Sequence, residues 1–233
     1  MLDVPQLTAE EIQSRVLHRD GLMLVIDKPP GLPVHRGPKG GPNLEASFDA
    51  LRFGLPRPPV LAHRLDKDTS GCLVLGRHRK ATASLGLLFK HGKISKTYWA
   101  IVEGGPADDE GTIDMPLGRL NAERGWWQKV DPEGQPAVTN WKVMGRGDDL
   151  TWMALEPVTG RTHQLRVHSA AQGWPIFGDN IYGNGPRFGE PRLHLHSHEI
   201  GIPISKNKDP VRVVAPAPEH MRERLKACGW NGE

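Results

Sequence analysis

The chain has 233 residues, of which 37% are hydrophobic and 24% are charged. This balance suits one globular domain with an ordinary core, and it excludes a largely disordered chain. No apolar run approaches the roughly 18 residues of a membrane span, and residues 1–17 lack the layout of a secretory signal. Cys72 and Cys228 have no metal-type spacing, which indicates reduced, partly buried thiols in a cytoplasmic protein.

The positive charge of the chain is concentrated in one segment. The formal net charge is only +3, but residues 61–100 carry eight Lys or Arg against Asp66 and Asp68, so this segment is +6 and the rest is −3. A local positive field is what a phosphate backbone needs. A solvated helix face explains the same charges equally well.

The first half of the chain predicts alternating short elements. Thr8 and Glu11 have the spacing of a capping box, so a helix is expected to begin at Ala9. A buried strand is expected over 22–26, ended by the prolines that follow it, and a helix over 44–51. A strand over 72–76 precedes a helix from Arg79 that stops at Gly92, and another strand follows over 97–103.

The second half predicts mainly strands. Residues 104–134 are polar and rich in turn residues, and no element is assigned to them. Strands are expected over 138–144 and 151–156, paired across a turn, and later over 193–200 and 211–215. Helices are expected over 162–172 and 218–228.

These elements predict an α+β fold with a mixed, largely antiparallel central sheet flanked by helices, because several neighbouring strands are joined too tightly for crossover helices. We expect a single catalytic domain over 21–233, with residues 1–20 as a short N-terminal extension. No internal repeat or linker divides the sequence.

The strongest chemical signal is His63-Arg-Leu-Asp-Lys-Asp-Thr-Ser-Gly71, a polar segment between two apolar runs. Such segments form loops at the rim of a sheet, where sites tend to lie. Arg64 and Lys67 flank the carboxylates, and a carboxylate near fixed cations stays ionised and can act as a nucleophile or a base. A purely structural turn with local charge pairing is the alternative.

Two further segments carry candidate residues. In Gly160-Arg-Thr-His-Gln-Leu-Arg-Val-His168, helical spacing lets His163 and Arg166 point together, and with Arg161 they could bind phosphate or a carboxylate. An exposed cationic face is the alternative. In Lys96-Thr-Tyr98, the tyrosine offers a flat ring with a polar tip that suits stacking on a base, although half-buried tyrosines are more often packing residues.

Together these segments resemble the RluA-type RNA pseudouridine synthases from about Gly21 to Pro218. Three more segments share the resemblance, and the order of all six agrees with the family: Leu24-Val-Ile-Asp-Lys-Pro-Pro-Gly-Leu-Pro-Val-His35, Gly134-Gln-Pro-Ala-Val-Thr139 and Gly178-Asp-Asn-Ile-Tyr-Gly183. The resemblance implies isomerisation of uridine in structured RNA, ribosomal or transfer, without metal or cofactor. It implies a monomeric catalytic domain without the small N-terminal RNA-binding (S4-like) domain of many relatives.

The resemblance also implies residue roles. Asp66 matches the catalytic aspartate, Tyr98 the tyrosine that packs on the flipped base, and Arg166 the arginine that pairs with the catalytic aspartate. Arg64 matches the arginine that enters the RNA stack. The expected RNA-binding residues are Arg64, His63, Lys67, Lys96, Arg161 and His163. Gln135 stands where the pattern has lysine, and Trp126-Trp127 has no assigned role.

Three other interpretations remain open from the residues alone. One is an RNA-binding module that has kept the fold without catalysis, which the intact Asp66, Tyr98 and Arg166 set disfavours. A second is a hydrolase with paired carboxylates at Asp66 and Asp68, which would release free uracil. The third is a metal site at His194, His196 and His198, which have no Cys or carboxylate partner at useful spacing.

Overall fold

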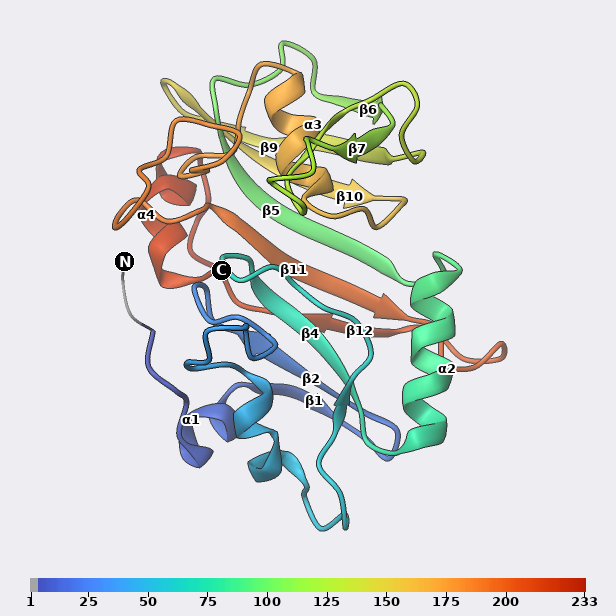
Figure 1. Cartoon of the computed structure of the whole chain (residues 1–233). Helices are drawn as coiled ribbons and strands as arrows, with labels where there is room; N and C mark the ends of the chain where they lie inside the picture. Colours follow the sequence, from blue (N-terminus) through green and yellow to red (C-terminus); the bar gives the residue numbers. More distant parts are fainter. Residues whose placement is uncertain (1–3) are drawn as a thin grey trace. The chain divides into compact units, whose positions relative to one another are not determined.

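The computed structural model describes residues 4–233, and this part of the chain forms two compact units (Figure 1). Among the described residues, unit 1 comprises residues 4–96 and Ser197–Pro216, and unit 2 comprises Thr97–His196 and Ala217–Glu233. Two strands, β5 (Ser95–Glu103) and β11 (Leu195–Ile202), contribute residues to both units.

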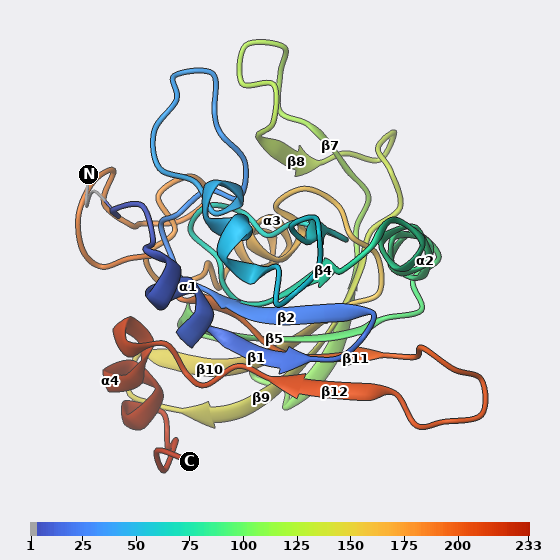
Figure 2. The same cartoon turned by 90° about the horizontal axis from the view of Figure 1, so that it is seen from below.

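Unit 1 is a sheet with helices and loops around it. Its strand order is β1-β2-β4-β11, with β3 paired to β4 and β12 paired to β11. Figure 2 shows β1 beside β2, and their pairing is antiparallel. The remaining elements of this unit are α1 (Ala9–Ser14), β1 (Val16–Arg19), β2 (Met23–Lys28), η1 (Glu45–Leu51), β3 (Val60–Leu61), β4 (Ser70–Gly76), α2 (Arg79–Lys90) and β12 (Val211–Val214).

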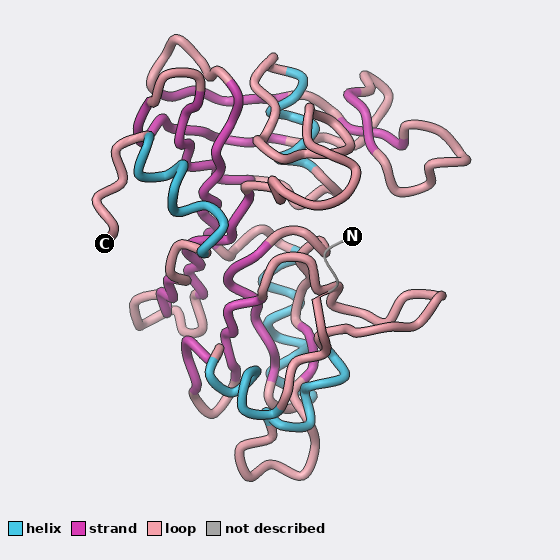
Figure 3. The backbone as a smooth tube through the Cα atoms, turned by 90° about the vertical axis from the view of Figure 1, so that its left-hand side faces the viewer, coloured by secondary structure: helices cyan, strands magenta, loops and turns pink. Residues whose placement is uncertain are grey.

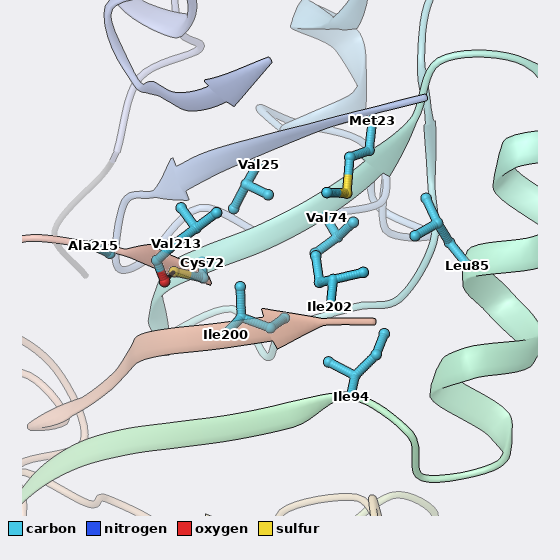
Figure 4. Packing of buried hydrophobic residues seen from close by; sticks show 10 residues of the cluster. All are labelled: Met23, Val25, Cys72, Val74, Leu85, Ile94, Ile200, Ile202, Val213 and Ala215. Atoms are coloured by element: carbon cyan, nitrogen blue, oxygen red, sulfur yellow. Dashed lines mark hydrogen bonds between the residues drawn. The ribbon is translucent and has the colours of Figure 1, made fainter. Parts of the chain in front are cut away.

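The core of unit 1 lies where β-branched and aliphatic side chains of the sheet meet α2 (Figure 4). All seven residues of β4 are buried, which is why its sequence is a continuous run of small and apolar residues rather than an alternating one. The buried members of the cluster are Met23, Val25, Cys72, Val74, Leu85, Ile94, Ile200, Ile202, Val213 and Ala215.

Unit 2 has the strand order β5-β10-β9-β6, and β7 and β8 form a separate two-stranded ribbon. Its cores pack the sheet against α3 and α4. Its remaining elements are β6 (Glu110–Asp114), β7 (Leu117–Arg119), β8 (Gln128–Val130), β9 (Val138–Arg146), β10 (Leu150–Pro157), α3 (Gln164–Ala171) and α4 (Glu219–Ala227).

The predicted α+β class with a mixed, mostly antiparallel central sheet is confirmed, and Figure 3 shows how far strands and loops outweigh helix. The capping box is confirmed in full, since Glu11 N–H donates to Thr8 Oγ1 and Thr8 N–H donates to the Glu11 carboxylate. The two cysteines are free, as expected, and both are fully buried rather than partly buried.

Four details differ from the expectations. The helix expected over 44–51 is a 3-10 helix, and the segment over 104–134 contains three short strands that were not assigned. Strand β1 was also missed; it precedes Gly21 and pairs with β2. Helix α3 begins at Gln164 rather than at 162, because His163 has a left-handed backbone (φ 54) that α-helix geometry excludes.

Candidate active site

The loop that carries Asp66 joins β3 to β4 at one end of the unit 1 sheet. Leu65 is buried and anchors the loop, while Asp66 and Asp68 are half-buried. Arg64 is exposed, so its long side chain can reach a ligand in solvent. The backbone N–H of Thr69 donates to the Asp66 carbonyl oxygen at 3.1 Å, which closes a turn around the two carboxylates.

The buried side chain of Lys28 fixes the backbone of this loop. It lies fully buried at the end of β2, and its ammonium donates to the carbonyl oxygens of Pro29 (2.8 Å), Lys67 (2.8 Å) and Thr69 (2.9 Å). An ammonium has three donors, and all three have acceptors here. Two of the acceptors flank Asp68, so Lys28 defines the path of the backbone just after Asp66.

Two opposing effects set the pKa of Lys28. Burial lowers the pKa of Lys28 to about 7, and the negative charges of Asp68 and Asp66 act in the opposite direction. The two carboxylates therefore favour the protonated form of the lysine, in which the ammonium donates to all three carbonyl oxygens.

The far end of the loop is fixed by a close approach of two strands. Gly71 has φ +106, and a Cβ atom there would collide with the backbone carbonyl of Ser197 on β11. Only glycine meets both demands. The loop is thus held at Lys67 by a buried cation and at Gly71 by direct backbone packing.

His63, expected among the RNA-binding residues, makes packing contacts at the start of the loop. Its ring stacks on Phe89 of α2 with centroids 4.1 Å apart, and its Nε2 accepts the Val74 N–H at 3.0 Å. Burial lowers the pKa of His63 to about 3, with the charge of Lys96 acting in the same direction. The ring is therefore neutral and holds the loop against α2 and β4.

In unit 2, the second motif forms α3 and the turn before it, and its polar residues are buried rather than exposed. Gln164, Arg166 and His168 are all at most 3% exposed. The exposed cationic face considered as an alternative is therefore wrong, because these side chains bond inside the unit.

The best-defined pair is Arg166 with Asp179. The Nε and Nη2 of Arg166 donate to the two carboxylate oxygens at 2.9 and 2.7 Å, and the carboxylate also accepts the N–H groups of Ile181 and Tyr182. Although burial acts to raise it, these bonds and the arginine charge leave the pKa of Asp179 lowered. This two-point contact fixes the plane of the guanidinium.

Asp179 was not among the residues predicted from the sequence. It lies in the Gly178–Gly183 segment, and the signal that could have found it is the need of a buried arginine for a carboxylate. Nothing in the sequence indicates which acid meets that need.

Tyr182 links α3 to its surroundings. Its hydroxyl accepts the Gln128 N–H at 2.9 Å and lies 2.7 Å from His163 Nδ1, and its ring lies 5.5 Å from the Arg166 guanidinium carbon. His163 and Arg166 thus meet at one tyrosine, but helical spacing is not the reason, since His163 precedes α3 with a left-handed backbone.

A second buried network holds the other side of α3. Gln164 accepts from Thr159 Oγ1 (2.7 Å) and donates to Thr139 Oγ1 (3.0 Å), which lies 2.8 Å from His168 Nδ1. His168 Nε2 is 2.9 Å from the carbonyl oxygen of Met115, so Nε2 carries the proton and Nδ1 accepts. This network makes the helix a rigid support for Arg166.

The other predicted residues fall on both units. Lys96 is half-buried at the unit 1 end of β5, where burial lowers its pKa. Tyr98 is half-buried on the unit 2 part of β5, packs against the cluster that contains Leu155 and is paired with that residue across the strands. Arg161 donates through Nε to the Pro136 carbonyl at 2.9 Å.

Histidines do not gather into a metal site in the part of the chain that is described: no group of three His, Cys, Asp or Glu side chains there could hold a metal ion. His194 Nδ1 is 2.6 Å from the Arg192 carbonyl oxygen and is thereby committed to the backbone. Among residues 4–233, no helix has both the length and the apolar character needed to cross a membrane.

Comparisons with known proteins agree with this arrangement. The family model for RNA pseudouridylate synthase matches residues 22–171. The chain is 42% identical to an uncharacterized RNA pseudouridine synthase of Zymomonas mobilis, covering 89% of this chain and 95% of that protein. It is 33% identical to ribosomal large subunit pseudouridine synthase C of Vibrio vulnificus, covering 91% and 69%. The structure of human RNA pseudouridylate synthase domain containing 4 superposes with a TM-score of 0.81 at 26% identity, covering 94% and 95%.

Proposed function

The chain belongs to the RNA pseudouridine synthase family and is therefore an isomerase acting on RNA; from this premise we propose that it modifies specific uridines of structured ribosomal or transfer RNA, with Asp66 as the essential carboxylate. The bond between ribose C1′ and uracil N1 breaks, the base turns, and C1′ joins C5. N1 gains a proton and C5 loses one, so no atom is gained or lost overall.

The support for Asp66 is the way its loop is built. A half-buried carboxylate lies on a loop whose backbone is fixed by a fully buried ammonium with three carbonyl partners. Preorganised placement of a reacting group is a main source of catalytic rate. The ionised carboxylate can attack the sugar or the base, or remove the C2′ proton.

Tyr98 and Arg166 are the unit 2 residues that we assign to the same reaction. The half-buried ring of Tyr98 offers a flat surface for the displaced base, and the guanidinium of Arg166 is held in one orientation by Asp179. Asp179 would act as a positioning residue, since it contacts the arginine and the backbone.

Arg64 is assigned to base extrusion. A uridine inside folded RNA must leave its stack before an enzyme can reach it, at a cost of a few kcal/mol. The exposed side chain of Arg64, two residues before Asp66, can fill the vacated space. Lys67, Lys96, Arg161 and His163 remain proposed RNA contacts, and His63 would serve RNA binding through the position of the loop.

We assign residues 21–233 to one catalytic domain acting as a monomer in the cytoplasm. The family match over 22–171 draws on both units, which supports a shared function. Two buried free thiols suit a reducing compartment. The family chemistry needs no cofactor.

The decisive experiment maps pseudouridines in total RNA from cells with and without the gene, and from cells that express Asp66→Asn. Specific pseudouridines should vanish without the gene and return with the wild-type protein but not with the variant. Unchanged maps would contradict the proposed function, and release of free uracil by the purified protein would favour the paired-carboxylate hydrolase.

A further inference from the structure

A tryptophan with most of its surface in solvent lies beside the N-terminus of α3. Trp126 is 59% exposed, in the loop over residues 120–127 that joins β7 to β8. A single exposed aromatic ring is ordinary on a protein surface, so the contacts around it decide whether it serves a ligand.

The loop holds Trp126 in a defined place. Its ends are closed by the Leu120 N–H donating to the Trp127 carbonyl at 2.7 Å, and its tip is held by the Arg124 N–H donating to Asn121 Oδ1 at 2.7 Å. The Trp127 ring is half-buried beneath the Arg124 guanidinium, 4.5 Å from the ring centre. The loop is therefore ordered before any ligand arrives, which lowers the entropic cost of binding.

The inner edge of Trp126 touches the proposed active-site framework. Its ring meets the His163 ring edge to face, with centroids 5.3 Å apart, and His163 in turn bonds to Tyr182. Tyr182 also accepts the N–H of Gln128, the first residue of β8, so the loop and α3 share one anchor. One edge of the Trp126 indole thus contacts His163, while most of its surface faces solvent.

The β7–β8 ribbon that carries this ring is basic. Residues 117–130 contain Arg119, Arg124 and Lys129 against Glu123, a net charge of +2, and the acidic Asp131 and Glu133 lie after the ribbon. A flat aromatic face beside cations matches a nucleobase with its phosphates, whereas an apolar protein partner would gain little from these cations.

We propose that Trp126 is a substrate-recognition residue on which a base of the RNA other than the target uridine stacks, with the nearby cations binding its phosphates. This inference rests on the proposed function for the identity of the RNA. It gives unit 2 a recognition contact of its own, joined through His163 and Tyr182 to the helix that carries Arg166.

Binding measurements with matched variants test the proposal. The RNA is a synthetic stem-loop that carries a uridine found by the mapping experiment, and Asp66→Asn is the background, so that turnover does not interfere. Trp126→Ala should weaken binding by about tenfold to hundredfold, as expected for one lost stacked base, whereas Trp126→Phe should keep most of the affinity. Phe188→Ala is the control, because Phe188 is 56% exposed in the same unit, has Arg187 beside its ring and lies outside the β7–β8 loop.

An abasic scan separates stacking from a general effect of the substitution. Single abasic nucleotides are placed in turn at each position around the target uridine. One abasic position should weaken binding to the Asp66→Asn protein as much as Trp126→Ala does, and it should cost the Trp126→Ala protein nothing more. Thermal unfolding of each variant shows whether the fold is intact. If Trp126→Ala unfolds at a lower temperature than its parent, the binding comparison uses Trp126→Phe and Trp126→Leu in its place.

The proposal is overturned if Trp126→Ala binds like its parent, or if its penalty is the same on every abasic RNA. Failure of the proposed function has a different signature, since wild-type protein would then form no pseudouridine in any RNA. In that case the same binding measurements, with the Trp126 variants and abasic positions in a uridine-rich oligoribonucleotide, still decide whether Trp126 stacks on a base.

Discussion

The buried ammonium of Lys28 donates to the backbone carbonyl of Lys67 at 2.8 Å, across 39 positions of the sequence. Lys67 is the residue after Asp66, so the end of β2 determines where the proposed catalytic carboxylate lies. The same carbonyl also accepts the Gly31 N–H at 2.9 Å. Two segments that share no local structure are therefore joined at the most reactive part of the chain.

Replacing Lys28 by Met should impair catalysis more than RNA binding. The substitution keeps an apolar stem but removes one donor from each of three carbonyl oxygens. The Lys67 oxygen keeps the Gly31 N–H, and each carbonyl that is left buried without a donor costs about 1–3 kcal/mol. The loop is expected to move, which lowers the single-turnover rate and the unfolding temperature. Lys206→Met, at an exposed position of unit 1, serves as control and should change neither. A normal rate in Lys28→Met would show that the loop keeps its shape without the ammonium.

The two carboxylates of the loop should differ sharply in importance. Asp66→Asn preserves size and removes charge, so pseudouridine formation should fall below detection while RNA binding is largely kept. Asp68→Asn should cost far less, because its role is the local balance of charge near Lys28. Equal loss in both variants would strengthen the hydrolase interpretation, and nucleoside analysis of the reacted RNA measures both.

Asp179→Asn should destabilise the protein and disturb Arg166. Removing one partner of a buried ion pair typically costs about 3–5 kcal/mol, because the other charge stays buried without compensation. Urea unfolding measures this cost. Asp109→Asn is a suitable control, since Asp109 also pairs with an arginine, Arg146, but its carboxylate is exposed. A cost in Asp179→Asn no larger than in the control would mean that solvent reaches the buried pair.

Arg64→Ala should act on base extrusion and therefore depend on the RNA. The penalty in single-turnover rate should be large on a structured stem-loop and small on a short single strand in which the uridine is already unstacked. Arg166→Ala should reduce the rate on both RNAs. A penalty for Arg64→Ala that is equal on the two substrates would exclude the extrusion role.

Acid should weaken the fold through His194. Burial lowers its pKa to about 3, and a proton on its Nε2 would face Arg224 Nη1, 3.4 Å away. An unfolded histidine binds a proton near pH 6.5, whereas folded His194 stays neutral until the pH approaches 3. Protonation therefore favours the unfolded state between these two values, so the free energy of unfolding is highest above about pH 6.5 and falls as the pH decreases toward 3. Urea unfolding measures how much the free energy of unfolding falls between about pH 7.5 and about pH 5, and this fall should be smaller for His194→Asn than for wild type. His91→Asn, at an exposed site, should match wild type.

Much of the fold could be predicted because local signals agreed with tertiary structure. The Thr8 capping box, the continuous apolar run of β4 and the two strands that pair as β9 and β10 are each confirmed close to the expected bounds. The strands β6, β7 and β8 could not be predicted, since they have five, three and three residues and bury only Ile113 and Leu117. Such strands depend on their neighbours rather than on a hydrophobic pattern.

The candidate site was only partly predictable for a similar reason. The motif placed Asp66 on a loop between strands, which the structure confirms. The role of Lys28 and the choice of Asp179 as the partner of Arg166 depend on contacts between residues 39 and 13 positions apart. Neither spacing is a helix or strand period, so no sequence pattern reports them.

The division of the chain into two interleaved units has a consequence for how the protein is made. Unit 1 needs Ser197–Pro216 to supply most of β11 and all of β12, and unit 2 needs Ala217–Glu233 to supply α4. A ribosome delivers these residues after all others of their unit, so neither unit can reach its final structure before its own later segment has been synthesised. A nascent chain halted after Lys96 carries the Asp66 loop but lacks the β11 backbone against which Gly71 packs.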